Sequence, residues 1–216
     1  MLKINRQYYG FICLVVLGLT TGCNAQVEPK QNTAALESKS TSAQNLQRYQ
    51  IQPIADFNEP WALAELPDGR LLITEKAGKL KLFDPKTGQS LDVQAIPEVA
   101  YGGQGGLGDV ILDPEFQQNQ QIYLSYAEVG TGGYGAVVIR GKLVLDAKPT
   151  PKLTETQRIW QQVPKVSGQG HYAHRIKFGA DGKLWISSGE RQKFEPAQDL
   201  KSNLGKILRL NADGSV

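Results

Sequence analysis

A histidine in a glycine-rich loop is the residue of this chain best suited to proton transfer. His171 follows the Gly-Gln-Gly tripeptide at 168–170 and precedes an apolar strand expected from Arg175 to Phe178. An imidazole at the mouth of a strand can accept a proton near neutral pH, because its unperturbed pKa lies in that range. His171 is therefore a candidate general base, and the alternative interpretation is a histidine in a surface turn.

His174, three residues further on, lies at the start of the same expected strand. Side chains alternate between the two faces of an extended strand, so His174 shares the apolar face with Ile176 and Phe178, while His171 has the opposite parity. We expect His174 to pack as a half-buried histidine with a hydrogen bond. A metal site at this i, i+3 spacing would need a helix and further ligands, which the surrounding glycines do not favour.

Gln104 is the second candidate, because glycines flank it on both sides at 102–103 and 105–106. Glycine lets the backbone approach a ligand closely, and a carboxamide can both donate to and accept from a sugar hydroxyl. The segment is not a phosphate loop, since no Lys-Ser/Thr pair follows it and no helix is expected after it. The alternative is a tight turn with a solvated glutamine.

Three charged residues complete the candidate site. Glu190 and Arg191 end the segment SSGER at 187–191, and Asp199 lies in PAQDL at 196–200. They could form a salt-bridged rim, or all three could orient a polar substrate at the same mouth as His171. Two carboxylates beside a histidine would also suit glycoside hydrolysis, but nothing in the sequence fixes their separation.

The elements that must position these residues are short strands in a repeated plan. The segments 63–78, 109–128 and 175–191 each read as an apolar strand, a turn rich in Asp, Pro, Gly or Asn, a second apolar strand and a polar exit. Repetition at a few tens of residues, without intervening helices, indicates an all-β propeller. A β-sandwich tolerates the same strand lengths, but the internal repetition favours the propeller.

The N-terminus reads as a targeting segment. Basic residues at 3 and 6 precede an apolar run at 10–19, and LTTGC at 19–23 resembles a bacterial lipobox with Thr20 where leucine is usual. We expect residues 1–22 to be a lipoprotein signal peptide, lipidation of Cys23, a flexible polar tether at 23–48 and the propeller at 49–216. This predicts anchoring in the bacterial cell envelope, on the outer membrane or periplasmic face. The alternative is an ordinary signal peptide with a chance cysteine.

Composition excludes other classes. The 216 residues carry a formal charge of +3 without a basic block interleaved with aromatics, so nucleic acid is not an expected partner. The two cysteines, Cys13 and Cys23, both precede the predicted domain. We therefore expect neither a disulfide nor a thiolate metal site within it.

Four phrases, in order, resemble the glucose/sorbosone dehydrogenase family of pyrroloquinoline-quinone (PQQ)-dependent aldose sugar dehydrogenases. They are PWALAELPDGRLLITEKAG (60–78), GQGGLGDVILDPEF with IYLSYAE (103–128), GHYAHRIKFGADGKLWISSGER (170–191) and AQDLKSNLGKILRLNADGSV (197–216). The resemblance implies a six-bladed β-propeller with PQQ over its central channel. It also implies that His171 takes the proton of the anomeric hydroxyl, that Gln104 lies near the sugar and, more loosely, that Arg191 lies on the substrate side.

The sequence differs from the family pattern at two positions near the candidate base. Gly170 stands where some members have an acidic residue before the histidine, and His174 stands where many have Gly or Ser. Family chains continue past the phrase NADGSV into blades that hold PQQ and Ca²⁺. The resemblance therefore implies that this chain is an N-terminal portion of about three to four blades, inactive alone. The whole protein is expected to pass electrons to an external acceptor. A non-catalytic sugar-binding propeller and a lactone or glycoside hydrolase are the alternatives.

Overall fold

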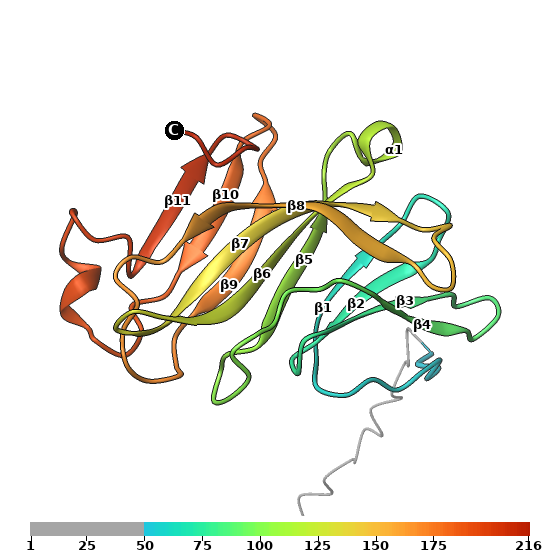
Figure 1. The fold of residues 1–216 in the computed structure, drawn as a ribbon, viewed down its shortest axis with the longest axis horizontal. Helices are drawn as coiled ribbons and strands as arrows, with labels where there is room; N and C mark the ends of the chain where they lie inside the picture. The colour runs from blue at the N-terminus through green and yellow to red at the C-terminus, as the bar shows by residue number, and fades with distance from the viewer. Residues whose placement is uncertain (1–49) are drawn as a thin grey trace, which may run out of the picture. The chain divides into compact units, whose positions relative to one another are not determined.

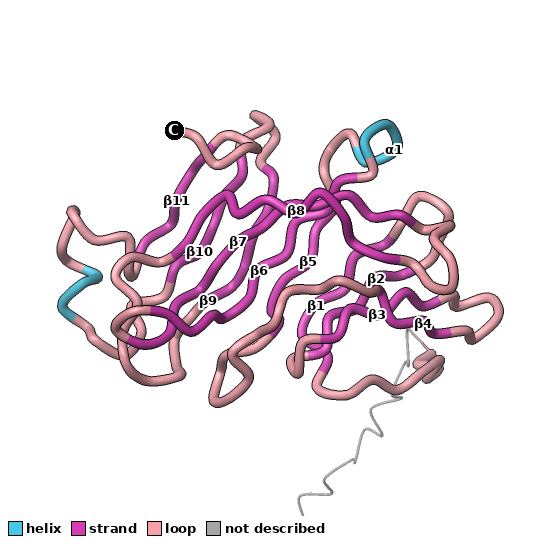
Figure 2. The backbone as a smooth tube through the Cα atoms, viewed as in Figure 1, coloured by secondary structure: helices cyan, strands magenta, loops and turns pink. Residues whose placement is uncertain are grey.

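A computed structural model describes residues 50–216, which form three antiparallel sheets (Figure 1). The strands are β1 (Pro60–Glu65), β2 (Leu71–Glu75), β3 (Lys79–Phe83), β4 (Ser90–Val93), β5 (Leu107–Leu112), β6 (Gln121–Gly130), β7 (Gly133–Val144), β8 (Lys152–Gln161), β9 (Ala173–Phe178), β10 (Leu184–Ser188) and β11 (Lys206–Leu210). Between the strands lie a four-residue helix, α1 (Phe116–Asn119), and a 3₁₀ turn, η1 (Glu195–Ala197) (Figure 2). The predicted signal peptide, the tether and Cys23 lie outside the described residues.

Each sheet is a meander in which neighbouring strands follow one another along the chain. The first contains β1 to β4, the second β5 to β8 and the third β9 to β11, and the first strands β1, β5 and β9 lie side by side (Figure 1). Successive meanders placed around a set of inner strands are the blades of a β-propeller. The predicted all-β propeller is confirmed, with three blades in residues 50–216, and the sandwich alternative is wrong. The helices of this part of the chain are too short to cross a membrane.

The repeated phrases of the sequence coincide with the first two strands of each blade. In the first blade, Gly69 takes a φ of 86° in the turn between β1 and β2, where its N–H donates to the carbonyl of Leu66. The second repeat places α1 in the corresponding connection between β5 and β6. Each repeated phrase therefore supplies two strands and the connection between them, as expected of blades with one common plan.

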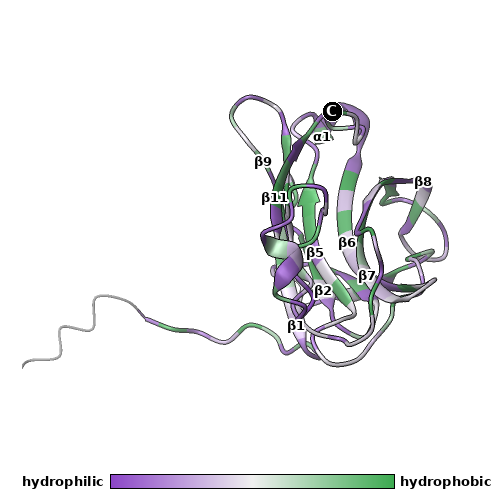
Figure 3. Ribbon diagram, turned by 90° about the vertical axis from the view of Figure 1, so that its left-hand side faces the viewer, coloured by the Kyte–Doolittle hydropathy of each residue, from purple (hydrophilic) through white to green (hydrophobic). Residues whose placement is uncertain are grey.

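Apolar side chains fill the space between neighbouring blades. Hydrophobic residues lie along strands such as β5 and β6, which Figure 3 colours green. In β9, His174 and Ile176 are buried while Arg175 and Lys177 are exposed, so the predicted parity of this strand is confirmed. Between the second and third blades the core is made by Tyr123, Val138, Ile176, Leu184, Ile186 and Leu210.

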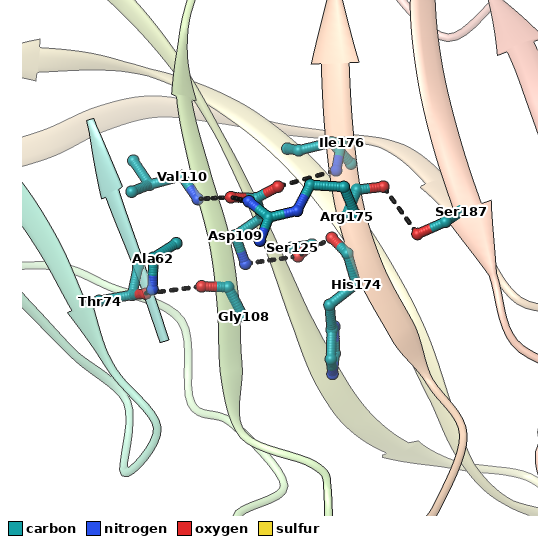
Figure 4. Close-up of polar contacts among 10 residues, drawn as sticks. All are labelled: Ala62, Thr74, Gly108, Asp109, Val110, Ser125, His174, Arg175, Ile176 and Ser187. Carbon is teal, nitrogen blue, oxygen red and sulfur yellow. Dashed lines mark hydrogen bonds and ion pairs between the residues drawn. The ribbon is translucent and has the colours of Figure 1, made fainter. Parts of the chain in front are cut away.

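Hydroxyl groups on the second strands join the inner strands of neighbouring blades (Figure 4). The hydroxyl of Thr74 in β2 donates to the carbonyl of Gly108 in β5 at 2.7 Å. Ser125 in β6 repeats this contact one blade further on, because its hydroxyl donates to the carbonyl of His174 at 2.7 Å and accepts from the N–H of Asp109 at 2.8 Å. The bonds of Ser125 fix the distance between β5 and β9, and β9 begins at the candidate site.

Asp109 is a buried carboxylate that the sequence did not reveal. It is 1% exposed and accepts from the N–H of Ile176 and from the guanidinium of Arg175, each at 2.9 Å. Burial raises the pKa of Asp109, while these bonds favour its charged form. The carboxylate therefore ties β5 to β9 near the beginning of both strands (Figure 4).

Ser125→Ala is expected to destabilise the domain by about 1–3 kcal/mol, because it leaves a buried N–H and a buried carbonyl without their partner. Urea unfolding followed by tryptophan fluorescence measures this. Ser187→Ala is the matched control, since that hydroxyl bonds only to the carbonyl of Arg175 within its own blade; its cost should stay within about 0.5 kcal/mol. Equal costs for the two variants would contradict the inter-blade role of Ser125.

Candidate functional site

The structure brings His171 and Gln104 together from loops of two neighbouring blades. Gln104 precedes β5 and His171 precedes β9. The side-chain oxygen of Gln104 accepts from the backbone N–H of His171 at 2.8 Å, and the N–H of Gln104 donates to the carbonyl of Gln169 at 2.7 Å. Two bonds therefore hold the loops at 102–106 and 168–171 edge to edge.

The glycines around Gln104 allow this close approach. A β-carbon on Gly103, whose φ is 53°, would stand 2.4 Å from the carbonyl oxygen of Gln169. A β-carbon on Gly102, with a φ of 146°, would meet the side chain of the same glutamine at 2.4 Å. The neighbour of Gly103 is a backbone oxygen that cannot swing away, so only glycine fits there, and the positive φ of Gly102 also favours glycine. The sequence had assigned this close approach to a ligand, but in the structure the neighbouring loop makes it.

Glu190 is the direct partner of the imidazole. One carboxylate oxygen of Glu190 contacts Nδ1 of His171, and the other accepts from the N–H of Gln192 at 2.5 Å. Burial raises the pKa of Glu190, but the bonds from His171 and from backbone N–H groups outweigh it, so the net pKa lies below its ordinary value. An ionised carboxylate can only accept, so the proton of a neutral His171 is on Nδ1 and the lone pair is on Nε2.

The sequence does not predict this contact. It places Glu190 only among the charged residues of the rim, and Gly170 occupies the position directly before the histidine where some family members have an acidic residue. The carboxylate comes from the exit of β10 instead, 19 residues along the chain. The pairing of β9 with β10 places that exit beside the entry of β9, because Ala173 is opposite Ser188.

The backbone around the imidazole is unusually contorted. The φ angles of His171, Ala173 and His174 are 49°, 73° and 65°. Those of Arg191 and Gln192, which follow Glu190, are 62° and 57°. Left-handed conformations at residues other than glycine cost on the order of 1 kcal/mol each and concentrate at functional sites. These residues cluster around the candidate base.

His174 is buried more deeply than predicted. Its ring is 4% exposed, stacks on Tyr172 with centroids 5.3 Å apart and meets the edge of Trp61 at 5.9 Å. Within residues 50–216 neither of its ring nitrogens has a hydrogen-bond partner, so the predicted half-buried, hydrogen-bonded histidine is wrong. Burial, and secondarily the charge of Arg191, lower the pKa of His174 to about 4. The ring is therefore neutral at pH 7.

Arg191 points inward rather than toward solvent. The residue is 1% exposed, and Nε, Nη1 and Nη2 each donate to a main-chain carbonyl, namely those of Gly170, Tyr134 and Gly168. The sequence had placed this side chain on the substrate side. The structure places it as a support of the loop that carries His171.

Asp199 lies apart from these groups. It is exposed, its carboxylate accepts from the N–H of Lys201, and it helps to line a pocket of about 550 Å³ beside Pro164, Val166 and Leu204. Among residues 50–216, no hydrogen bond joins Asp199 to His171, Gln104 or Glu190. Its role in binding a substrate stays a prediction. The same part of the chain holds no group of three or more His, Cys, Asp or Glu residues placed to bind a metal ion.

Comparison with known proteins decides the family. A sequence profile of the family described as Glucose / Sorbosone dehydrogenase matches residues 57–216. The chain belongs to this family. Among its relatives, Aldose sugar dehydrogenase YliI of Escherichia coli (strain K12) is 40% identical over 162 residues, which cover 74% of this chain and 43% of that protein. Quinoprotein glucose dehydrogenase B of Acinetobacter calcoaceticus is 27% identical over 188 residues, covering 76% and 39%.

Solved structures of glucose/sorbosone dehydrogenases share the fold. The apo-form of the soluble aldose sugar dehydrogenase of Escherichia coli superposes with a TM-score of 0.69 at 39% identity, covering 74% of this chain and 46% of that one. The PQQ-bound aldose sugar dehydrogenase of Streptomyces coelicolor gives 0.65 at 29% identity, covering 76% and 48%. The chain thus spans about half the length of the relatives that it matches.

Family membership confirms the resemblance drawn from the four sequence phrases. The matched region, residues 57–216, includes all three blades and the loops at 102–106 and 168–171. The roles expected of His171, Gln104, Arg191 and Asp199 stay predictions.

Proposed function

We propose that this glucose/sorbosone dehydrogenase takes part in PQQ-dependent oxidation of aldose sugars to lactones, with His171 as the general base. The observation that carries the proposal is the contact of Glu190 with Nδ1 of His171, at a rim where Gln104 holds the backbone of the same histidine. A carboxylate on one ring nitrogen and access to solvent on the other is the arrangement that a base needs. The side chain of His171 is 45% exposed.

The proton moves from sugar to imidazole in this scheme. With Nδ1–H donated to Glu190, Nε2 of His171 accepts the proton of the C1 hydroxyl of a cyclic aldose. The charge of Glu190 then stabilises the imidazolium that forms. The hydrogen on C1 leaves as hydride with the electron pair of the C1–H bond, and the pair of the broken O–H bond forms the carbonyl of the lactone. PQQ, when bound, would supply the hydride acceptor. The sugar departs as its lactone.

Gln104 is proposed to orient the sugar. Its side-chain oxygen is already occupied by the N–H of His171, so the exposed amide group is left to donate through Nε2. An N–H donor suits a sugar hydroxyl oxygen next to the one that loses its proton. Because one side chain contacts both the base and the sugar, it can set the distance between them.

The described residues fit the sugar side of the reaction. They supply a base, its carboxylate and a donor, and the proposal places the ligands of Ca²⁺ outside residues 50–216. Anchoring through Cys23 in the bacterial cell envelope and delivery of electrons to an external acceptor belong to the same proposal. They follow from the lipobox-like phrase at 19–23 and from quinone chemistry.

Dye reduction tests the proposed function. The protein expressed from its gene, with any sequence that follows Val216, is assayed in the membrane fraction with aldoses and an artificial acceptor, with and without PQQ and Ca²⁺. Activity that requires both the quinone and the acceptor, with lactone as product, is expected. Turnover without any acceptor would favour a hydrolase instead. Sugar binding without quinone absorbance or dye reduction would favour a non-catalytic propeller.

A further inference from the structure

We propose that Arg191 is a positioning residue that holds the loop of His171 in its working conformation. The inference rests on the proposed function of His171 as a base, and it assigns Arg191 a different task from the substrate contact expected from the sequence. The argument comes from what each nitrogen of the buried guanidinium touches.

The guanidinium joins the loop of His171 to the neighbouring blade. Nε donates to the carbonyl of Gly170 at 2.8 Å and Nη2 donates to that of Gly168 at 2.6 Å, both in the loop that precedes β9. Nη1 donates at 2.5 Å to the carbonyl of Tyr134, which lies in β7 of the second blade. The planar group therefore fixes two points of the loop against a strand of the adjacent sheet.

Arg191 also holds the residues on either side of His171. Its guanidinium carbon lies 3.6 Å from the centroid of the Tyr172 ring, and its backbone N–H donates to the carbonyl of His171 at 3.3 Å. Gly170, His171 and Tyr172 are thus all in contact with one residue. Because His171 has a φ of 49°, its backbone would relax toward ordinary conformations without such contacts.

The environment argues against a direct contact with sugar. Arg191 is 1% exposed, its three side-chain hydrogen bonds go to main-chain carbonyls, and the ring of Tyr172 covers one face of the guanidinium. Burial lowers the pKa of Arg191, so keeping this cation inside the protein is costly. A lysine would keep the charge but could not hold three carbonyls in a plane.

Steady-state kinetics of the holoenzyme separate positioning from substrate binding. Arg191→Lys and Arg191→Ala are expected to lower kcat by about 10- to 100-fold, with KM within about threefold of the parent, because a misplaced base slows the chemical step. Added guanidinium ion should restore part of the kcat of Arg191→Ala. A raised KM with unchanged kcat would overturn the proposal in favour of a sugar contact.

Arg209→Ala is the matched control. Arg209 also packs over an aromatic ring of the third blade, Trp185 at 6.0 Å, and it bonds to Asp181 at 2.8 Å, away from the loop of His171. Its kcat and KM should both stay within about twofold of the parent, as for most exposed substitutions.

Hydrogen exchange tests positioning without sugar, cofactor or turnover. The amide of His171, bonded to Gln104, should exchange at least about tenfold faster in Arg191→Lys, while amides of β6 and β7 keep their protection, since a locally loosened loop opens more often. Unchanged exchange in this variant would overturn the proposal. The two proposals can fail separately. If the wild-type protein has no dehydrogenase activity but the amide of His171 still exchanges faster in Arg191→Lys, the proposed function is refuted and the positioning role stands.

Discussion

Replacing His171 by alanine is expected to lower kcat for aldose oxidation by about 10²- to 10⁴-fold, the usual contribution of a positioned general base. The variant loses the only exposed imidazole in residues 50–216, whereas Gln104, the proposed sugar contact, remains. KM should therefore change much less than kcat. Dye reduction at saturating sugar, with the cofactor present, measures the effect.

Two further variants sharpen this test of the base. Glu190→Gln keeps a side chain of the same shape but removes the charge opposite the imidazolium, so an intermediate loss of kcat is expected. His174→Phe leaves the Glu190–His171 contact in place and serves as the control for loss of a histidine. Wild-type kcat in His171→Ala would show that the base lies elsewhere.

His174→Phe is expected to remove much of the domain's loss of stability in acid. The pKa of His174 is about 4 in the folded protein, against an ordinary value of 6.5. Between these values the unfolded chain binds the extra proton, so the free energy of unfolding falls as the pH drops from about 6.5 to about 4. The shift corresponds to about 3 kcal/mol, all of it retained at pH 7.

Urea unfolding at pH 7.5 and at pH 4 measures this difference. Phenylalanine keeps a ring between Tyr172 and Trp61 and removes two buried nitrogens that have no partner among residues 50–216, so stability at pH 7.5 should be equal or higher. Burial raises the pKa of Asp109 and so opposes the trend, but that contribution cancels when the variant is compared with the parent. The same acid-induced loss in both proteins would contradict the assignment.

The strands and their order could be predicted from the sequence because they depend on local patterns. The segment 61–84 alternates apolar runs with Pro-Asp-Gly and Ala-Gly turns, and it folds as β1, β2 and β3 with their turns in place. Its repetition at 109–128 and 175–191 indicated blades, since only neighbours of the same kind can cover both faces of such sheets. The joints between blades, such as Asp109 to Ile176, were not predictable, because they link residues 67 positions apart.

In the candidate site too, local features could be predicted from the sequence and long-range contacts could not. The sequence by itself determined that His171 and Gln104 stand in glycine-rich loops before inner strands, since parity and glycine spacing are local properties of the chain. Only the tertiary structure decided that Glu190 contacts the imidazole, that Arg191 points inward and that the ring of His174 is buried with no hydrogen-bond partner in the described part of the chain. Those outcomes depend on how two strands pair and how two blades pack. Contacts between residues that are distant in the sequence produce no repeating pattern in the sequence from which they could be predicted.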